Sequence, residues 1–237
     1  EIELQAVIAE VEQDLDRVRK IENYDTALQF RIARCFYDLD RFREAYLVLQ
    51  EMVDKLPVSD LLLQANYQML VSLTKMERWD EAVASADVFA ERFPDSELLN
   101  NTLYLKAEAL MRLFRYGEAS VVFYDIVQKF PDFGQAERCH FLAGYCLMME
   151  ERNMEAIEQF EKHLERWPRG EFREQVIYWE AMAYYYDKKY DQSREEHAEY
   201  LKEFPKGQYA VDSQYRRAHA LFGQENFIEA YKELETF

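Results

Sequence analysis

The sequence has little glycine and proline, with 6 and 5 residues respectively among 237. Sandwiches of β-sheets need many tight turns and disordered linkers are rich in both residues, so neither class fits. No apolar run approaches the roughly 18 residues that a membrane-spanning helix requires, so we expect no direct membrane insertion. No signal peptide is visible and the chain starts at Glu1, so we expect a processed or trimmed chain.

Motifs of catalysis are missing too. The 4 histidines and 3 cysteines show no HExxH or CxxC-like spacing, and no glycine-rich phosphate loop or nucleophile motif occurs. We therefore predict that the protein is not an enzyme, and that it has no catalytic residue, no cofactor and no metal.

Positive charge is also scarce, and the formal net charge is −17. A surface this acidic repels nucleic acid and anionic lipid headgroups. We expect no nucleic-acid partner, and a cationic or neutral partner is favoured. Hydrophobic residues make up 49% of the chain, which is enough to build a core.

The sequence does contain a repeat. All five prolines, at 57, 94, 131, 168 and 205, are spaced by 37 residues, and a fixed period of 20–50 residues is typical of a solenoid. With each proline as position 1, position 11 is aromatic, position 16 is small, and position 26 is alanine or serine throughout. These columns extend one repeat towards the N-terminus and define six repeats: 20–56, 57–93, 94–130, 131–167, 168–204 and 205–237.

Inside each repeat the apolar residues have helical spacing. One stripe includes Phe141, Gly144 and Leu147, and a second stripe, as in Ala119 and Phe123, follows after a short polar joint. Proline cannot continue a helix, so it ends the second helix of the repeat. We predict an all-α fold of antiparallel helix pairs with no strand, and about thirteen helices once an N-terminal helix is added.

The columns resemble the tetratricopeptide repeat (TPR). Gly144, Ala156, Phe160 and Pro168 match its small residue, its alanine, its apolar residue and its closing proline. The TPR tryptophan is missing and the period is longer. This longer form with an "FPDS" joint is similar to bacterial envelope TPR proteins, such as the lipoprotein of the outer-membrane β-barrel assembly machine and a periplasmic division coordinator. The resemblance implies a right-handed α-solenoid in the bacterial periplasm or envelope, with the cytoplasm as the alternative.

Residues 1–19 precede the repeats and show a heptad pattern. Leu4, Ile8, Val11, Leu15 and Val18 are spaced by four and three residues in turn. We expect a helix that caps the first repeat, and a helix that drives self-association is the alternative. The last repeat stops short at Phe237, and we expect that the chain continues or that another chain covers this end.

The cysteines and histidines are predicted to be structural. Cys35 and Cys146 occupy position 16, so both should be buried, and all three cysteines should be reduced. Cys139 lies seven residues from Cys146 on one helix, about 10.5 Å along its axis, which is too far for a disulfide. His163 and His197 occupy columns that are apolar in other repeats, so we expect core or half-buried rings.

A binding groove is predicted on the first helices of the repeats, because these helices line the concave face of TPR arrays. In repeats 131–167 and 168–204 this side carries aromatic and methionine side chains on an otherwise acidic protein. With two nearby arginines, the predicted groove comprises Arg138, Leu142, Tyr145, Met149, Trp179, Met182, Tyr186 and Arg216. Packing between neighbouring first helices would also explain some of these side chains.

The sequence thus predicts a non-enzymatic scaffold that binds a peptide or protein segment in its groove, as part of a bacterial envelope assembly. The alternative is a structural subunit that forms homo-oligomers through the N-terminal helix or the ends of the solenoid.

Overall fold

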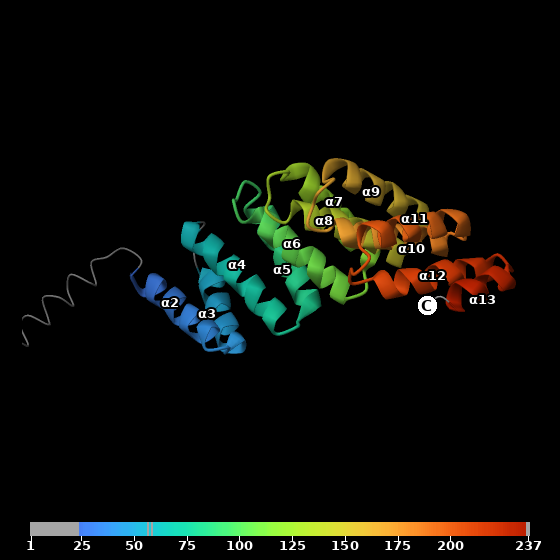
Figure 1. Ribbon diagram of the computed structural model, residues 1–237. Helices are drawn as coiled ribbons and strands as arrows, with labels where there is room; N and C mark the ends of the chain where they lie inside the picture. Colours follow the sequence, from blue (N-terminus) through green and yellow to red (C-terminus); the bar gives the residue numbers. More distant parts are fainter. Residues whose placement is uncertain (1–23, 56, 58, 236–237) are drawn as a thin grey trace, which may run out of the picture. The chain divides into compact units, whose positions relative to one another are not determined.

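The computed structural model describes residues 24–55, 57 and 59–235 (Figure 1). All regular secondary structure among these residues is α-helical, in twelve helices. They are α2 (Tyr24–Asp38), α3 (Phe42–Lys55), α4 (Asp60–Lys75), α5 (Trp79–Arg92), α6 (Leu99–Arg112), α7 (Tyr116–Lys129), α8 (Ala136–Met149), α9 (Asn153–Arg166), α10 (Arg173–Tyr186), α11 (Tyr190–Glu203), α12 (Ala210–Gly223) and α13 (Phe227–Glu235). Each predicted repeat therefore holds two helices, whereas the predicted N-terminal helix in residues 1–19 lies outside the described residues.

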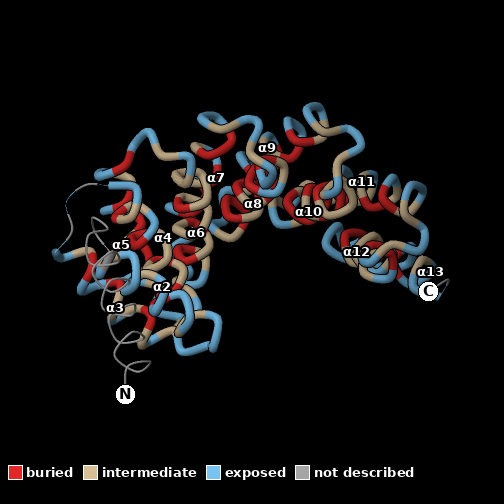
Figure 2. Tube along the Cα trace, turned by 90° about the vertical axis from the view of Figure 1, so that its left-hand side faces the viewer, coloured by how far each residue is buried: buried red, intermediate tan, exposed pale blue. Residues whose placement is uncertain are grey.

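The chain forms two compact parts, residues 1–102 and 103–237. In the first part, α2 packs on α3, α3 on α4, and α4 on α5. In the second part, the helices from α7 to α13 pack in the same consecutive manner. Buried residues are frequent along α8 and α10, whereas α13 is largely exposed (Figure 2). None of the helices in the described ranges combines the length and apolar character that crossing a membrane requires.

The two helices of a repeat meet at the columns that the sequence singled out. In α8 and α9, a Cβ atom on Gly144 would lie only 2.7 Å from Cε1 of Phe160. Phe160 and Ala156 are completely buried in this contact. The small residue therefore lets the second helix approach the first, as the periodicity predicts.

A residue with positive φ follows the first helix in every repeat. The backbone then closes with a Schellman-type hydrogen bond, as where the N–H of Arg115 donates to the carbonyl of Leu110 at 2.9 Å. The six residues, with φ from 57° to 62°, are Asp40, Glu77, Phe114, Glu151, Lys188 and Glu225. Apart from Asp40, none is glycine, asparagine or aspartate, the usual residues for this conformation, so the sequence predicts the polar joint but not its left-handed residue.

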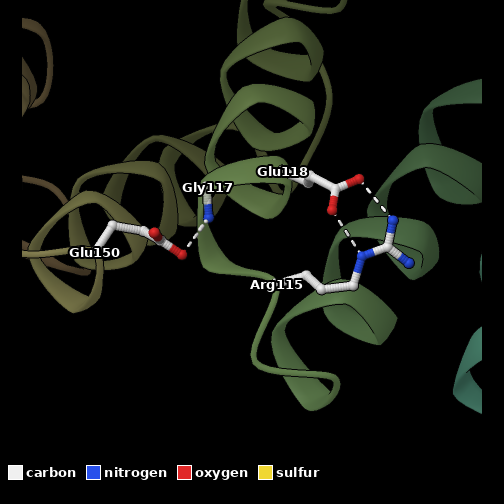
Figure 3. A network of polar contacts seen from close by, with 4 residues as sticks. All are labelled: Arg115, Gly117, Glu118 and Glu150. Atoms are coloured by element: carbon white, nitrogen blue, oxygen red, sulfur yellow. Dashed lines mark hydrogen bonds and ion pairs between the residues drawn. The ribbon is translucent and has the colours of Figure 1, made fainter.

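Polar contacts join neighbouring repeats in the second part. Glu150, just after α8, accepts a hydrogen bond at 2.9 Å from the N–H of Gly117 in α7 (Figure 3). In the same view, Arg115 donates two hydrogen bonds to Glu118, at 2.7 and 2.6 Å. The bond to Glu150 ties the start of α7 to the end of α8, and the pair of Arg115 with Glu118 lies at the start of α7.

A carboxylate near the start of α10 binds the segment just before α12, the first helix of the next repeat. Glu174 accepts hydrogen bonds from the N–H of Gln208 and the hydroxyl of Tyr200, both at 2.6 Å. A Cβ on Gly207 would lie 2.4 Å from Glu174 Oε1, so glycine is required for this approach. Glu137 in α8 likewise accepts a hydrogen bond from the N–H of Phe172, at 2.9 Å.

The cysteine predictions are confirmed in part. All three cysteines are free, and Cys139 and Cys146 are buried. Cys35, however, is exposed, so the prediction of a buried Cys35 is wrong for the described structure. In later repeats the residues of the same column, such as Ser72 and Ala220, are completely buried. Their helices pack on the second helix of the preceding repeat, whereas α2 has no described helix before it.

The histidine predictions are confirmed. The rings of His163 and His197 are completely buried. Desolvation lowers the pKa of each to about 4, so both rings are neutral at pH 7 and serve as core residues.

Candidate functional site: the first-helix wall of α8, α10 and α12

The predicted groove residues lie on α8, α10 and α12, the first helices of three consecutive repeats. Neighbouring helices of this set meet through aromatic side chains. Tyr145 of α8 lies edge-on to Trp179 of α10, with ring centroids 5.0 Å apart. Tyr185 of α10 shares a 2.6 Å hydrogen bond with Nδ1 of His219 in α12. We call the exposed side of these three helices the first-helix wall.

Several predicted groove residues contribute to packing. Tyr145, Leu142 and Trp179 are partly buried against the core of this part, and Trp179 also lies 6.5 Å from the ring of Tyr209. Met182 is only 2% exposed and belongs to the core itself. Met182 is therefore buried in the core of this part and is not presented on the exposed side of the helices, so it does not offer a contact surface there.

Met149 and Tyr186 remain accessible. They line one surface hollow of about 420 Å³ together with Met148, Glu151 and Asn153. Tyr186 is 51% exposed, and Met149 is partly exposed at the end of α8. The hollow is open, and it offers an aromatic face and thioether groups beside one acidic side chain.

Glu151 and Asn153 were not predicted as site residues. Glu151 lies in the turn between α8 and α9 and is the residue with positive φ in this repeat, and Asn153 is the first residue of α9. The left-handed conformation of Glu151 has no signature in the sequence. The position of Glu151 beside Met149 therefore depends on how the turn folds.

The two predicted arginines already have acidic partners. Arg138 lies 3.6 Å from Glu108 and its guanidinium lies over the ring of Tyr104 at 5.7 Å. Arg216 pairs with Asp212 at 3.1 Å. An acidic group of a partner would therefore share each guanidinium with a carboxylate of this chain, which weakens the attraction of these positions for acidic ligands.

Asp212 links α10 to α12. Its carboxylate accepts a 2.5 Å hydrogen bond from the hydroxyl of Tyr178. Burial and this carboxylate raise the pKa of Tyr178 above its ordinary value, so the phenol keeps its proton and its donor role. The pair positions the wall rather than presenting a reactive group.

A buried carboxyl lies behind the wall. Glu180 of α10 is 5% exposed, and desolvation, with smaller contributions from Glu196 and Glu161, raises its pKa to about 8. Within the described residues, no group of three or more histidine, cysteine or acidic side chains is arranged to hold a metal ion.

The structure is similar to solved TPR structures. A TPR protein from Parabacteroides merdae superposes with a TM-score of 0.65 at 16% identity, covering 89% of this chain and 77% of that one. The C-terminal part of a TPR-containing protein from Cytophaga hutchinsonii gives 0.63 at 17% identity, with 86% and 77% covered. YrrB, described as a TPR protein with an unusual peptide-binding site, gives 0.60 at 16%, with 78% and 90% covered. These likenesses confirm the TPR fold.

One family model also matches the sequence. The model described as an outer membrane lipoprotein, YfiO, matches residues 140–237. This range includes α9, α10, α11, α12 and α13 and most of α8. Among curated proteins no match was found.

Proposed function

We propose that the protein is a non-enzymatic scaffold that binds a peptide or protein segment along the first-helix wall. The observation that carries this proposal is the hollow formed by Met149 of α8 and Tyr186 of α10. Aromatic and methionine side chains are typical of protein interfaces, because aromatic rings bury much apolar surface and the flexible thioether adapts to the shape of a partner.

The partner is a segment with at least one apolar anchor side chain. The hollow has room for one such side chain, and Glu151 at its rim favours a neutral or cationic neighbour in the ligand. The formal net charge of −17 acts in the same direction over longer distances. Because Arg138 and Arg216 are paired within the chain, an acidic ligand would compete with Glu108 and Asp212 for their positive charge.

The cell envelope of a bacterium is the proposed location, and an assembly there is the proposed context. The match of residues 140–237 to an outer membrane lipoprotein family supports this. The peptide-binding site described for YrrB, a protein of the same fold, supports peptide binding as a use of such an array.

The test is a selection of peptides against the purified chain, followed by affinity measurements with variants. Tyr186→Ala should weaken the selected peptides by roughly tenfold, the equivalent of ~1.4 kcal/mol. Tyr124→Ala is the matched control, since Tyr124 is also an exposed tyrosine, at 40%, but lies on the second helix α7. It should leave the affinity unchanged.

Trp179→Ala should weaken the same peptides, and it should also lower the stability, because Trp179 is partly buried between helices. Circular dichroism of each variant separates loss of binding from loss of fold. Peptides that bind the Tyr186→Ala and Met149→Ala variants as tightly as the parent would show that the hollow is not the site.

A second candidate function is self-association. It is favoured by the exposed apolar side chains of α13, where Phe227, Ile228 and Tyr231 line a further hollow and Ile228 is 72% exposed. Light scattering of the parent and of Ile228→Asp would distinguish the two. A concentration-dependent dimer that this substitution abolishes would support self-association.

A further inference from the structure

The outer face of α2 carries an apolar stripe. Leu28, Ile32 and Leu39 are 42%, 41% and 67% exposed, and Cys35 between them is also exposed. The four residues are spaced by four, three and four positions, so they lie on one side of the helix. Exposing such a stripe to water is unfavourable, by about 25 cal/mol per Å² of apolar surface.

In the later repeats the columns of Leu28 and Cys35, positions 9 and 16, are buried, whereas the column of Leu39, position 20, is exposed or half-buried. The first helices α4, α8, α10 and α12 pack on the second helix of the preceding repeat. Position 9 holds Ala65 in α4 and Cys139 in α8, and both are completely buried. At position 13, the backbone carbonyl of Ala143 in α8 accepts a 3.0 Å hydrogen bond from Ser120 of α7. The stripe on α2 is therefore a docking face for a helix that precedes it.

The residues before α2 match this face in length. In the sequence, the stripe from Leu4 to Val18 spans 15 residues and is followed by five residues before Tyr24. The second helices α5, α7, α9 and α11 are 14 residues long, and six residues separate each from the next first helix. A link of five residues spans at most ~18 Å, which is enough for a helix over 4–18 to return alongside α2 in the antiparallel direction.

The two stripes also match in register. Both have heptad spacing, the pattern that packs two helices side by side. In an antiparallel hairpin that turns midway along the link, all four residues of the α2 stripe face an apolar residue of the N-terminal stripe, and only Val18 faces a polar residue, Asp25. The facing pairs are Leu4 with Leu39, Ile8 with Cys35, Val11 with Ile32, and Leu15 with Leu28.

We propose that residues 4–18 form a helix that docks antiparallel on the Leu28–Leu39 stripe of α2 within the same chain. This segment takes the place of the second helix of a preceding repeat and closes the N-terminal end of the first part. The proposal is independent of the peptide-binding function, since the wall lies on other helices.

The first test is a cysteine placed opposite Cys35. In the full chain, Ile8→Cys should form a disulfide with Cys35 under mild oxidation, because facing positions bring the two Cα atoms into the range that a disulfide spans. Peptide mapping identifies the pair, and gel mobility shows whether the link lies within one chain. Glu10→Cys is the matched control, since position 10 lies on the opposite side of the same helix, and it should not be linked.

The second test measures the shielding of Cys35. In the full-length double variant Ile8→Asp/Leu15→Asp, a thiol reagent should label Cys35 at least tenfold faster than in the parent. Cys139 and Cys146 report on the rest of the fold and should remain protected.

Two outcomes would overturn the proposal. If the Ile8→Cys variant links its introduced thiol to Cys35 only between two chains, the segment belongs to self-association. Absence of this disulfide, with equally rapid labelling of Cys35 in the parent and in the double variant, would show that the stripe is uncovered.

Discussion

Gly144 of α8 lies directly beneath the ring of Phe160 of α9, and a Cβ at position 144 would be 2.7 Å from Cε1 and 3.0 Å from Cδ1. Phe160 is completely buried, so its ring has no free space into which it can move. Gly144→Ala should therefore destabilise the protein by about 1–3 kcal/mol through overpacking, although alanine favours a helix over glycine by about 1 kcal/mol.

The matched control for Gly144→Ala is Gly117→Ala. Gly117 is also helical, but a Cβ there meets only the flexible side chain of Glu150, at 3.6 Å. This variant should be neutral or slightly stabilised in urea unfolding. Equal stability of Gly144→Ala and the parent would mean that the second helix does not depend on the small residue.

Glu174 and Gly207 should be energetically coupled. Glu174→Ala removes the acceptor for the N–H of Gln208 and the hydroxyl of Tyr200, and leaving them unpaired should cost about 1–3 kcal/mol. Gly207→Ala should cost a similar amount, because its Cβ would meet Glu174 Oε1 at 2.4 Å. In a double-mutant cycle the combined loss should be smaller than the sum of the two single losses. Full additivity would show that the two residues act separately.

Glu180 should make the protein less stable as the pH rises. Burial, followed by the charges of Glu196 and Glu161, raises its pKa from 4.5 to about 8, so the folded state favours the protonated carboxyl. The free energy of unfolding is therefore not reduced by Glu180 below pH ~4.5, and it falls as the pH rises from ~4.5 to about 8.

Glu180→Gln removes this ionisation. It should raise the free energy of unfolding by about 4 kcal/mol at pH 8, since the pKa rises from 4.5 to about 8 and one pKa unit corresponds to ~1.4 kcal/mol, and it should have little effect at pH 5. Glu165→Gln, an exposed glutamate on α9, is the control and should change stability by less than ~0.5 kcal/mol. A pH profile of Glu180→Gln parallel to that of the parent would refute this assignment.

His197 should produce an acid sensitivity of the opposite sign. Desolvation lowers its pKa from 6.5 to about 4, so its contribution is complete above pH ~6.5 and is lost as the pH falls towards 4. His197→Phe restores the side chain that Phe123 and Phe160 place in this column, and it should flatten the fall in stability between pH 6.5 and 4.5. Urea unfolding over this range measures the slope, and an unchanged slope would exclude His197 as its source.

The sequence alone determined the repeat and its helices. The period of 37 residues, the helical spacing and the position of each proline depend on local geometry, and all are readable without a structure. The small residue at Gly144 and the apolar columns of His163 and His197 could be assigned to the core for the same reason, because a helix has one buried face and the columns mark it.

The candidate site was only partly predictable. Met149 and Tyr186 could be placed on one wall from their columns, but Met182 shares the wall pattern and is nevertheless buried. Arg138 reads as a free charge in the sequence, whereas its pair with Glu108 forms only in the fold. Arg216 and Asp212 are four residues apart on one helix, so the sequence could have shown that pair. The partner of Arg138 lies in the preceding repeat, where helical spacing within one helix cannot reveal it.

Only the tertiary structure decided which columns stay accessible. Cys35 and Cys146 occupy the same column, yet one is exposed and the other buried, because burial at this position depends on a neighbouring repeat and not on the helix itself. The position of Glu151 beside Met149 likewise depends on the three-dimensional fold of the turn between α8 and α9. Local spacing fixes which side of a helix is apolar, but contacts between repeats decide whether that side is covered, and these contacts join residues far apart in the sequence.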